Sequence, residues 1–278
     1  MEKASDLITQ GRTAEVWQTY CGFLDLRMDE FMRIQERLLM EQMHLFAACK
    51  LGRQIIGEKV PTSVAEFRRL VPLTEYQDYE PYLSEKREDV LPQLPYTWAH
   101  TSGRSGKYKW VPYTEPAYVK AGKRMLTSLI LGTARQKGEI RLEGNDVIVY
   151  NLPARPYASG VALSSMMQLV NFRFVPSIEE SEKMTFQERV EKSFQIALET
   201  GMDVIGSMTA VLVKIGERFA QGAGGASLAG YLRHPRALLR LVRAFLRSKL
   251  AGRPLLPKDV WTVKGVGCAG TDTALYKD

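Results

Sequence analysis

The residues best suited to chemistry lie in one short segment, residues 101–109. It reads Thr101-Ser102-Gly103-Arg104-Ser105-Gly106-Lys107-Tyr108-Lys109. Glycines free the backbone to curl, so that successive N–H groups can converge on an anion. The hydroxyls add short donors and the three cations add charge, a combination that a triphosphate requires. The spacing is not the Walker pattern. From composition alone, a flexible surface loop is the alternative interpretation.

Two stretches of sequence resemble a known family. The segment at 101–109 resembles the phosphate-binding signature of the acyl-adenylate-forming superfamily, Thr/Ser-Ser-Gly-Thr/Ser-Thr/Ser-Gly-Lys-Pro-Lys. Upstream, residues 71–82 (VPLTEYQDYEPY) resemble the segment that precedes this loop in the auxin-responsive acyl-acid amido synthetases and their bacterial relatives. Residues 152–156 (LPARP) are similar to a further stretch of that branch. Two motifs in the right order favour a nucleotide-binding loop over a surface loop.

The resemblance also implies roles for individual residues of the loop. Phosphate contacts carry over to Thr101, Ser102, Gly103, Ser105, Gly106, Lys107 and Lys109. Two positions depart from the family, since Arg104 stands where Thr or Ser is usual and Tyr108 replaces the common Pro. The guanidinium of Arg104 could pair with a phosphate or crowd the site, and both alternatives stay open.

The resemblance further implies a two-step reaction with ATP and Mg²⁺. A substrate carboxylate attacks the α-phosphorus of ATP, and pyrophosphate leaves to give an acyl-adenylate. An amine or thiol acceptor, CoA among the candidates, then attacks the activated carbonyl. The loop would orient the leaving phosphates and offset their charge.

A second glycine cluster, residues 265–270 (GVGCAG), has two interpretations. It fits the dinucleotide fingerprint G-x-G-x-x-G, but the acidic partner expected further on would lie past Asp278. In the family interpretation the same segment lines the adenine pocket, with Gly270 and Thr271 as adenine contacts. The family's Thr-Glu metal motif, ribose-binding Asp and lid Lys would come later still. We therefore expect an N-terminal portion of a longer synthetase, without full activity alone, that needs a C-terminal portion or a partner subunit.

The spacing of apolar residues predicts the elements that position these segments. Helix patterns and start signals occur at about residues 26–50, 63–67, 75–87 (with Thr74 as the cap), 114–130, 161–171, 185–200, 207–220 and 234–250. Residues 146–152 and 260–266 are predicted to be buried strands. Strands separated by long helices predict an α/β fold. We expect a helical N-terminal region over residues 1–95. A layered α/β subdomain of the adenylate-forming type, itself incomplete, would follow over residues 96–278.

Positive charge is concentrated in one region, residues 218–258, which holds nine basic residues and no acidic one. Arg236, Arg240, Arg243 and Arg247 form one stripe of the predicted helix, opposite Leu238, Leu241, Val242 and Phe245. The simplest interpretation is a solvated basic face over a core-facing apolar stripe. Sharper ones are a surface for anionic lipid, for the phosphates of an acceptor, or for the missing part of the enzyme. A non-catalytic binding or scaffold protein acting through helix 233–253 is therefore the alternative function.

Composition excludes several classes. A chain of 278 residues with 45% hydrophobic residues and a net charge of +7 is typical of a soluble globular protein. Three scattered cysteines predict reduced thiols in the cytoplasm, and neither they nor the three histidines form a metal or catalytic pattern. The polar N-terminus is no signal peptide, and the longest apolar stretch, residues 204–213, is too short for a transmembrane segment. Nucleic acid is not expected as a partner, because the basic region has no interleaved aromatics.

Overall fold

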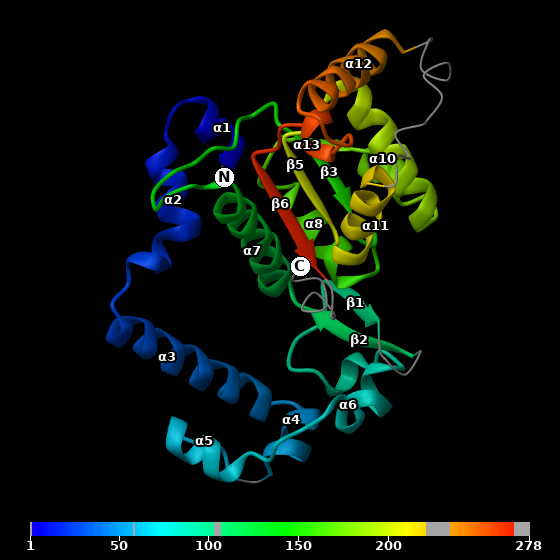
Figure 1. The fold of residues 1–278 in the computed structure, drawn as a ribbon. Coiled ribbons are helices and arrows are strands. Elements are labelled where there is room, and N and C mark those ends of the chain that lie inside the picture. Colours follow the sequence, from blue (N-terminus) through cyan, green and yellow to red (C-terminus); the bar gives the residue numbers. More distant parts are fainter. Residues whose placement is uncertain (1, 58, 103–106, 221–233, 270–278) are drawn as a thin grey trace.

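The computed structural model describes residues 2–57, 59–102, 107–220 and 234–269 (Figure 1). The α-helices are α1 Ala4–Thr9, α2 Thr13–Cys21, α3 Met28–Ala47, α4 Lys50–Ile56, α5 Val64–Leu70, α6 Tyr76–Leu83, α7 Glu115–Thr133, α8 Ala158–Met166, α9 Ile178–Ser181, α10 Phe186–Thr200, α11 Thr209–Ala220, α12 Pro235–Leu250 and α13 Pro257–Val260. Short 3-10 helices are η1 Gly22–Asp25 and η2 Glu88–Val90. The strands are β1 Thr97–Ser102, β2 Tyr108–Tyr113, β3 Val147–Asn151, β4 Arg173–Val175, β5 Val204–Met208 and β6 Gly265–Ala269.

The centre of the fold is a parallel sheet with the strand order β4-β3-β5-β6. Helices cover both of its faces, so the strands are apolar on both sides. Along β3, Ile148 joins the core under α7 and α8, whereas Val149 joins the core under α10 and α12. The predicted α/β fold is therefore confirmed, as a layered sheet between two groups of helices (Figure 1).

The first two helices belong to the core of this α/β layer. Val16 and Cys21 of α2 are fully buried in the same cluster as Leu126 and Ile130 of α7. The hydroxyl of Thr127 donates to the carbonyl of Tyr20 at 2.9 Å, which fixes α2 along α7. Residues 4–21 therefore pack against α7, a helix that comes much later in the sequence.

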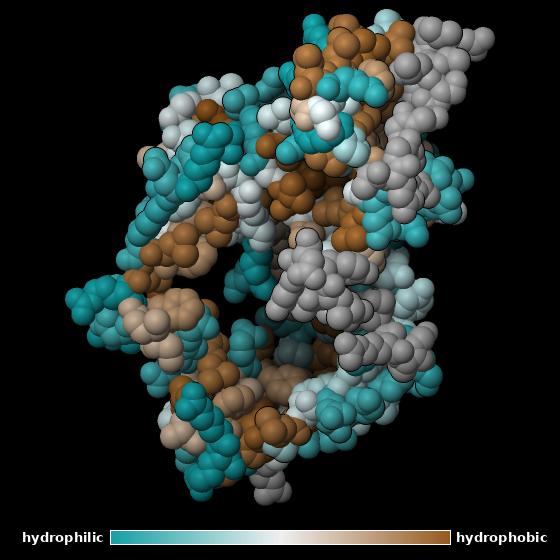
Figure 2. Space-filling model, viewed as in Figure 1, coloured by the Kyte–Doolittle hydropathy of each residue, from teal (hydrophilic) through white to brown (hydrophobic). Residues whose placement is uncertain are grey.

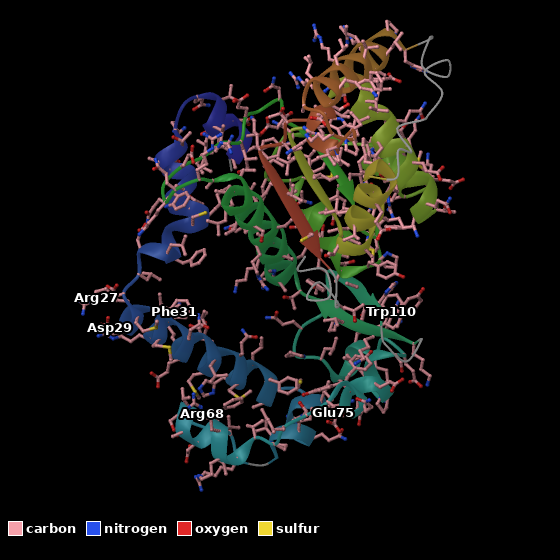
Figure 3. All side chains as sticks on the ribbon, viewed as in Figure 1. Arg27, Asp29, Phe31, Arg68, Glu75 and Trp110 are labelled. Atoms are coloured by element: carbon pink, nitrogen blue, oxygen red, sulfur yellow. The ribbon has the colours of Figure 1, made fainter. Side chains whose placement is uncertain are left out.

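Helices α3 to α6 form an arm that leads away from the sheet and back to it (Figure 1). The arm has a small core of its own, in which Cys49, Leu51 and Val90 are buried against partly buried aromatics. Arg27 and Asp29, labelled in Figure 3, mark the start of the arm, at the first turn of α3.

The strands differ in part from those that the sequence predicts. The strand predicted at 146–152 is confirmed as β3. The strand predicted at 260–266 begins only at Gly265, because Pro257–Val260 form α13 and bury Val260 in the core. Strand β5 was not predicted: it runs straight into α11, so that its apolar residues merge with the helical pattern.

The predicted helix starts agree with the structure more closely than the predicted strands do. Thr114 caps α7, and its hydroxyl accepts from the amide of Ala117 at 3.4 Å. Helix α6 begins one residue later than predicted, since Glu75 rather than Thr74 occupies the cap position.

The orientation of α12 corrects the simplest interpretation of the basic helix. Small residues, Ala237, Ala244 and Ser248, face the core, and of the expected apolar stripe only Leu241 packs against it. Val242 and Phe245 are exposed instead, Phe245 by 52%. The helix therefore presents apolar side chains as well as cations to its surroundings, and Figure 2 shows both kinds of residue over α12.

Candidate nucleotide site

The predicted phosphate loop joins two antiparallel strands. In the register of the hairpin, Thr101 of β1 faces Lys109 of β2 and Ser102 faces Tyr108, so the loop begins where the pairing ends. Ser102 is the last residue of β1. Among the predicted phosphate contacts, Gly103, Arg104, Ser105 and Gly106 lie outside the described residues, as do the predicted adenine contacts Gly270 and Thr271.

Exposed donors and cations gather at the open end of the hairpin. Thr101 is exposed, and the side chain of Lys107 is 81% exposed. The ammonium of Lys107 lies 3.8 Å from a carboxylate oxygen of Glu80, which keeps it near α6. The ammonium of Lys109 lies 5.4 Å from the centre of the Tyr76 ring. Lys107 is exposed and Lys109 is half-buried, and cations in these positions are able to approach a bound anion.

A cluster of aromatic rings packs within and against the hairpin. The ring of His100 stacks on Tyr108 at 4.0 Å between centroids and lies edge-on to Tyr157 at 4.2 Å. The amide of His100 also donates to the carbonyl of Pro156 at 2.9 Å, which ties β1 to the segment after β3. Burial, and then the nearby charge of Lys86, lower the pKa of His100 and so favour its neutral form.

Helix α6 fastens the second strand of the hairpin. The hydroxyl of Tyr76 accepts from the amide of Trp110 at 2.7 Å and donates to the carbonyl of the same residue at 3.2 Å. The ammonium of Lys86 lies 3.6 Å from the centre of the Trp110 ring. Figure 3 labels Trp110 on this strand and Glu75 at the start of α6. The segment at 71–82 therefore contacts β2, one of the two strands that flank the loop.

Unpaired polar atoms mark the carboxyl ends of the central strands. Asn151 ends β3 and is paired in register with Ser207 near the end of β5, and both are fully buried. In the part of the chain that the structure describes, the amide atoms of Asn151 and the hydroxyl of Ser207 have no hydrogen-bond partner. Buried polar atoms rarely stay unpaired, and the carboxyl edge of a parallel sheet is where ligands bind in open α/β folds. Both residues are therefore candidate ligand contacts.

Sequence reasoning missed Asn151 and Ser207. The available signal was a polar residue at the end of an apolar strand, in the runs VIVYN and VIGSM. Strand β5 was itself not recognised, so its end could not be compared with the end of β3.

An apolar pocket of about 180 Å³ lies between α7 and the sheet. Glycines at Gly206, Gly265 and Gly267 leave room along β5 and β6, while Met125, Leu129 and Phe174 are among the apolar residues that line it. A Cβ at Gly206 would come within 3.6 Å of the Tyr150 ring, so a larger side chain there would extend into this space. The pocket continues to Leu152 and Cys268 at the carboxyl edge.

The structure also bears on metal binding and on membrane spans. Among the described residues, no group of three or more His, Cys, Asp or Glu side chains is placed to hold a metal ion. None of the described helices is both long and apolar enough to cross a membrane.

The chain was compared with curated proteins and with protein-family models. A search of curated proteins finds no match to the chain. The family model described as the GH3 family N-terminal domain matches residues 22–210, which include the arm, the hairpin and β3 to β5. Because this match extends over more than half of the sequence, the chain belongs to the GH3 family, the family of the auxin-responsive acyl-acid amido synthetases.

Proposed function

We propose that this protein takes part in the ATP-dependent activation of a carboxylic acid as an acyl-adenylate, with transfer of the acyl group to an amine or thiol acceptor. GH3 enzymes in general are adenylate-forming acyl-acid ligases that use ATP and Mg²⁺. The finer assignment to this chain depends on the hairpin that carries residues 101–109.

The position of that hairpin is the observation that carries the proposal. Strand β1 lies beside the segment after β3 through the bridge between His100 and Tyr157, and β6 points toward the hairpin in Figure 1. The cations of the hairpin and the unpaired atoms of Asn151 and Ser207 thus belong to the same end of the sheet. A nucleotide held there would have its phosphates beside Lys107 and Lys109.

In this arrangement the chain supplies binding and orientation. Thr101 and Lys107 would donate to phosphate oxygens, and charge-assisted bonds of this kind are about twice as strong as neutral ones. Asn151 and Ser207 would donate to, or accept from, the ligand at the strand ends. The Mg²⁺ that would accompany ATP has no cluster of three or more His, Cys, Asp or Glu ligands among the described residues. When bound, it would offset the charge of the phosphates.

The apolar pocket beside α7 suits the organic part of the acid. Its walls are almost entirely apolar, and its volume of about 180 Å³ corresponds to a small acyl group. The carboxylate of such an acid would face the carboxyl edge, where the pocket continues to Leu152 and Cys268.

The test is calorimetric titration of the chain with ATP–Mg²⁺. We expect binding that Gly103→Val and Lys107→Ala each weaken by about tenfold, the equivalent of one charge-assisted hydrogen bond. Lys137→Ala is the matched control, because it also removes one exposed lysine but pairs with Asp25 on η1. Absence of binding by the unaltered chain, or equal binding by all variants, would contradict the proposal.

The second candidate is a non-catalytic scaffold that acts through helix 233–253. The exposed apolar and basic side chains of α12 favour it. A chain that does not bind ATP–Mg²⁺ would support this alternative.

A further inference from the structure

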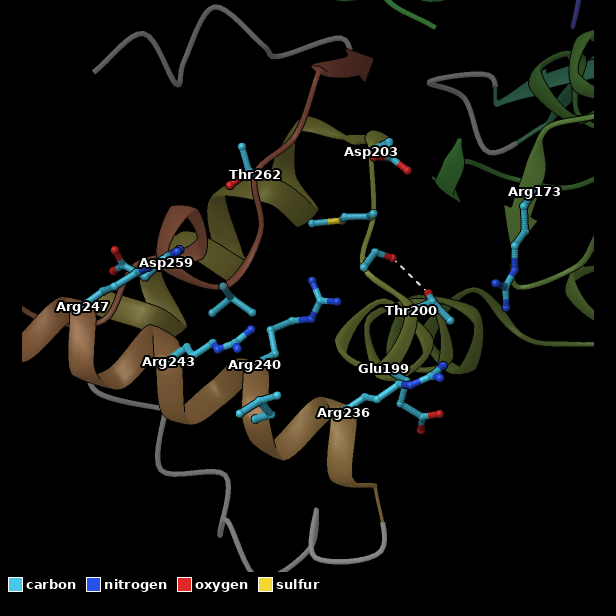
Figure 4. Close-up of a pocket in the computed structure, with 14 residues that line it drawn as sticks. Arg173, Glu199, Thr200, Asp203, Arg236, Arg240, Arg243, Arg247, Asp259 and Thr262 are labelled. Carbon is cyan, nitrogen blue, oxygen red and sulfur yellow. Dashed lines mark hydrogen bonds between the residues drawn. The ribbon is translucent and has the colours of Figure 1, made fainter. Parts of the chain in front are cut away.

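The structure contains a second cationic site at the amino ends of the parallel strands, which is the end of the sheet away from the hairpin. A hollow of about 630 Å³ opens beside the amino ends of β4, β5 and β6 (Figure 4). Arginines from two elements line it. They are Arg173 at the start of β4, and Arg236, Arg240, Arg243 and Arg247 on α12. The hollow shares no lining residue with the hairpin or with the apolar pocket.

Three acidic residues also line the hollow, and each has a polar partner other than its arginines. Glu199 contacts the Nδ1 atom of His234 at 2.8 Å. Asp259 accepts two hydrogen bonds from the Arg253 guanidinium, each of 2.7 Å. Asp203 accepts from the amide of Val147 at 2.8 Å. These carboxylates therefore have other partners than the arginines of the hollow.

The five arginines outnumber the three carboxylates of the hollow, and none of them forms an ion pair with a described residue. Within the described ranges, none of them lies within 4.0 Å of a carboxylate oxygen. Four of the five are exposed, and Arg240 is half-buried. Like charges gathered in one concave surface repel one another, so an anion that enters the hollow removes a cost of folding and makes favourable contacts as well.

The side chain of Arg240 is fixed by a hydrogen bond to the backbone of α10. Its Nε donates to the carbonyl of Leu198 at 3.0 Å, which fixes the plane of the guanidinium. The two terminal nitrogens lie against Gly201, where a Cβ would be 3.2 Å from the nearer one. Gly201 has a φ of 87°, a conformation that favours glycine. In the described structure the two terminal nitrogens have no hydrogen-bond partner, and Figure 4 shows the side chain directed into the hollow.

We propose that this hollow binds phosphate groups of a polyanionic ligand, independently of the nucleotide loop. The planar fork of a guanidinium matches two oxygens of one phosphate, and several forks around one cavity match several phosphates. A volume of about 630 Å³ is within the usual range for small-molecule sites. An acidic protein segment fits less well, because it would need a more extended cationic surface than this hollow.

The phosphates could come from a soluble polyphosphate or from lipid headgroups. Leu239 lines the hollow, and Leu246 and Leu250 are exposed further along α12, Leu250 by 89%. A basic helix with exposed apolar residues is typical of proteins that lie on anionic membranes. The chemistry of phosphate recognition is the same for both sources, so the experiment has one part for each.

The first part titrates the whole chain with inorganic tripolyphosphate. We expect saturable binding that Arg243→Gln weakens by about tenfold and the double variant Arg240→Gln/Arg243→Gln weakens further. Arg243 makes no described hydrogen bond, so its replacement tests the site even if Arg240→Gln disturbs the fold. These titrations are made in the Lys107→Ala background, because the nucleotide loop should also bind a triphosphate. Lys137→Ala, which removes an exposed lysine that pairs with Asp25, is the control and should leave the binding within about twofold.

The second part measures co-sedimentation with vesicles of phosphatidylcholine alone and of phosphatidylcholine mixed with phosphatidic acid. A lipid source predicts binding to the acidic vesicles only, which is lost in Arg243→Gln and in Leu246→Ser/Leu250→Ser. A soluble source predicts tripolyphosphate binding that the two leucine replacements leave unchanged. If neither probe binds, or if the arginine variants bind like the unaltered chain, the proposal is wrong. Arg243 lies on α12 and not in the hairpin, so ATP–Mg²⁺ binding that Arg243→Gln leaves unchanged would distinguish this failure from failure of the proposed ligase function.

Discussion

The ammonium of Lys264 lies 2.7 Å from Oδ1 of Asp146, and this pair joins the amino end of β6 to that of β3. Only 2% of the Asp146 surface is exposed. Burial raises the pKa of Asp146, and the hydrogen bond from Lys264 acts against that rise. For Lys264, burial acts to lower the pKa, but the contacts with Asp146 and Glu143 outweigh it and the pKa is raised.

We therefore expect Lys264→Met to reduce the free energy of unfolding by about 1.5–3 kcal/mol, because it leaves a buried carboxylate without its cation. Urea denaturation measures this loss. The double variant Lys264→Met/Asp146→Asn removes both charges and should recover part of the stability. Equal stability of Lys264→Met and the unaltered chain would show that the pair contributes nothing.

Asp259 gives a prediction about acid stability. The guanidinium of Arg253, and then the amide of Leu256, lower the pKa of this carboxyl to about 2. Since the folded pKa lies below the unfolded one, the ionised carboxylate stabilises the fold above about pH 4, and this contribution is lost as the pH falls from about 4 to about 2. Asp259→Asn should make the fall in stability over this window shallower. A pH series of urea midpoints tests it, and an unchanged slope would contradict it.

Two glycines of α7 should respond in opposite directions to alanine. A Cβ at Gly122 would lie 2.4 Å from the Ser165 hydroxyl and 2.6 Å from the Ser165 backbone, because α8 packs closely there. Gly122→Ala should therefore destabilise the protein by about 1–3 kcal/mol. Gly132 has no atom within 4 Å of the same position, so Gly132→Ala should stabilise it by about 0.5–1 kcal/mol through helix propensity. Thermal unfolding of both variants makes the comparison.

The hydroxyl of Tyr76 should matter more than other hydroxyls of its helix. Tyr76→Phe leaves the amide and the carbonyl of Trp110 without their partner, at an expected cost of about 1–3 kcal/mol. Tyr79→Phe is the control, because the hydroxyl of Tyr79 only contacts the exposed hydroxyl of Thr74. If the hairpin binds a nucleotide, Tyr76→Phe should also weaken ATP–Mg²⁺ binding, while Tyr79→Phe should not. Equal unfolding curves for the two variants would exclude the anchoring role.

The fold class and most helices could be predicted from the sequence because their signals are local. Thr114 followed by Glu and Pro starts α7, and apolar residues three and four apart define α3 and α10. Strand β5 was not predicted, because the strand and the helix that follows it give one continuous apolar run. The start of β6 was placed too early for a similar reason, since Val260 and Val263 pack in the core without being in a strand.

The candidate site was predictable only where it forms a contiguous motif. Residues 101–109 are consecutive, whereas Asn151 and Ser207 come together through the register of two parallel strands. The arginines of the hollow were visible as a stripe on one helix, but Arg173 comes from a separate strand. Which side of α12 faces the core depends on close packing of Ala237 and Ala244, and a hydrophobic pattern favours the larger residues instead.

The packing of the first two helices has a consequence for synthesis of the chain. Residues 4–21 are synthesised before their buried partners, which include Leu126, Ile130, Phe174 and Val204. Long-range contacts of this kind form late and slow the folding of a domain. Helices α1 and α2 therefore lack their complete core until β5 has been translated, and during this interval their apolar side chains are exposed to aggregation.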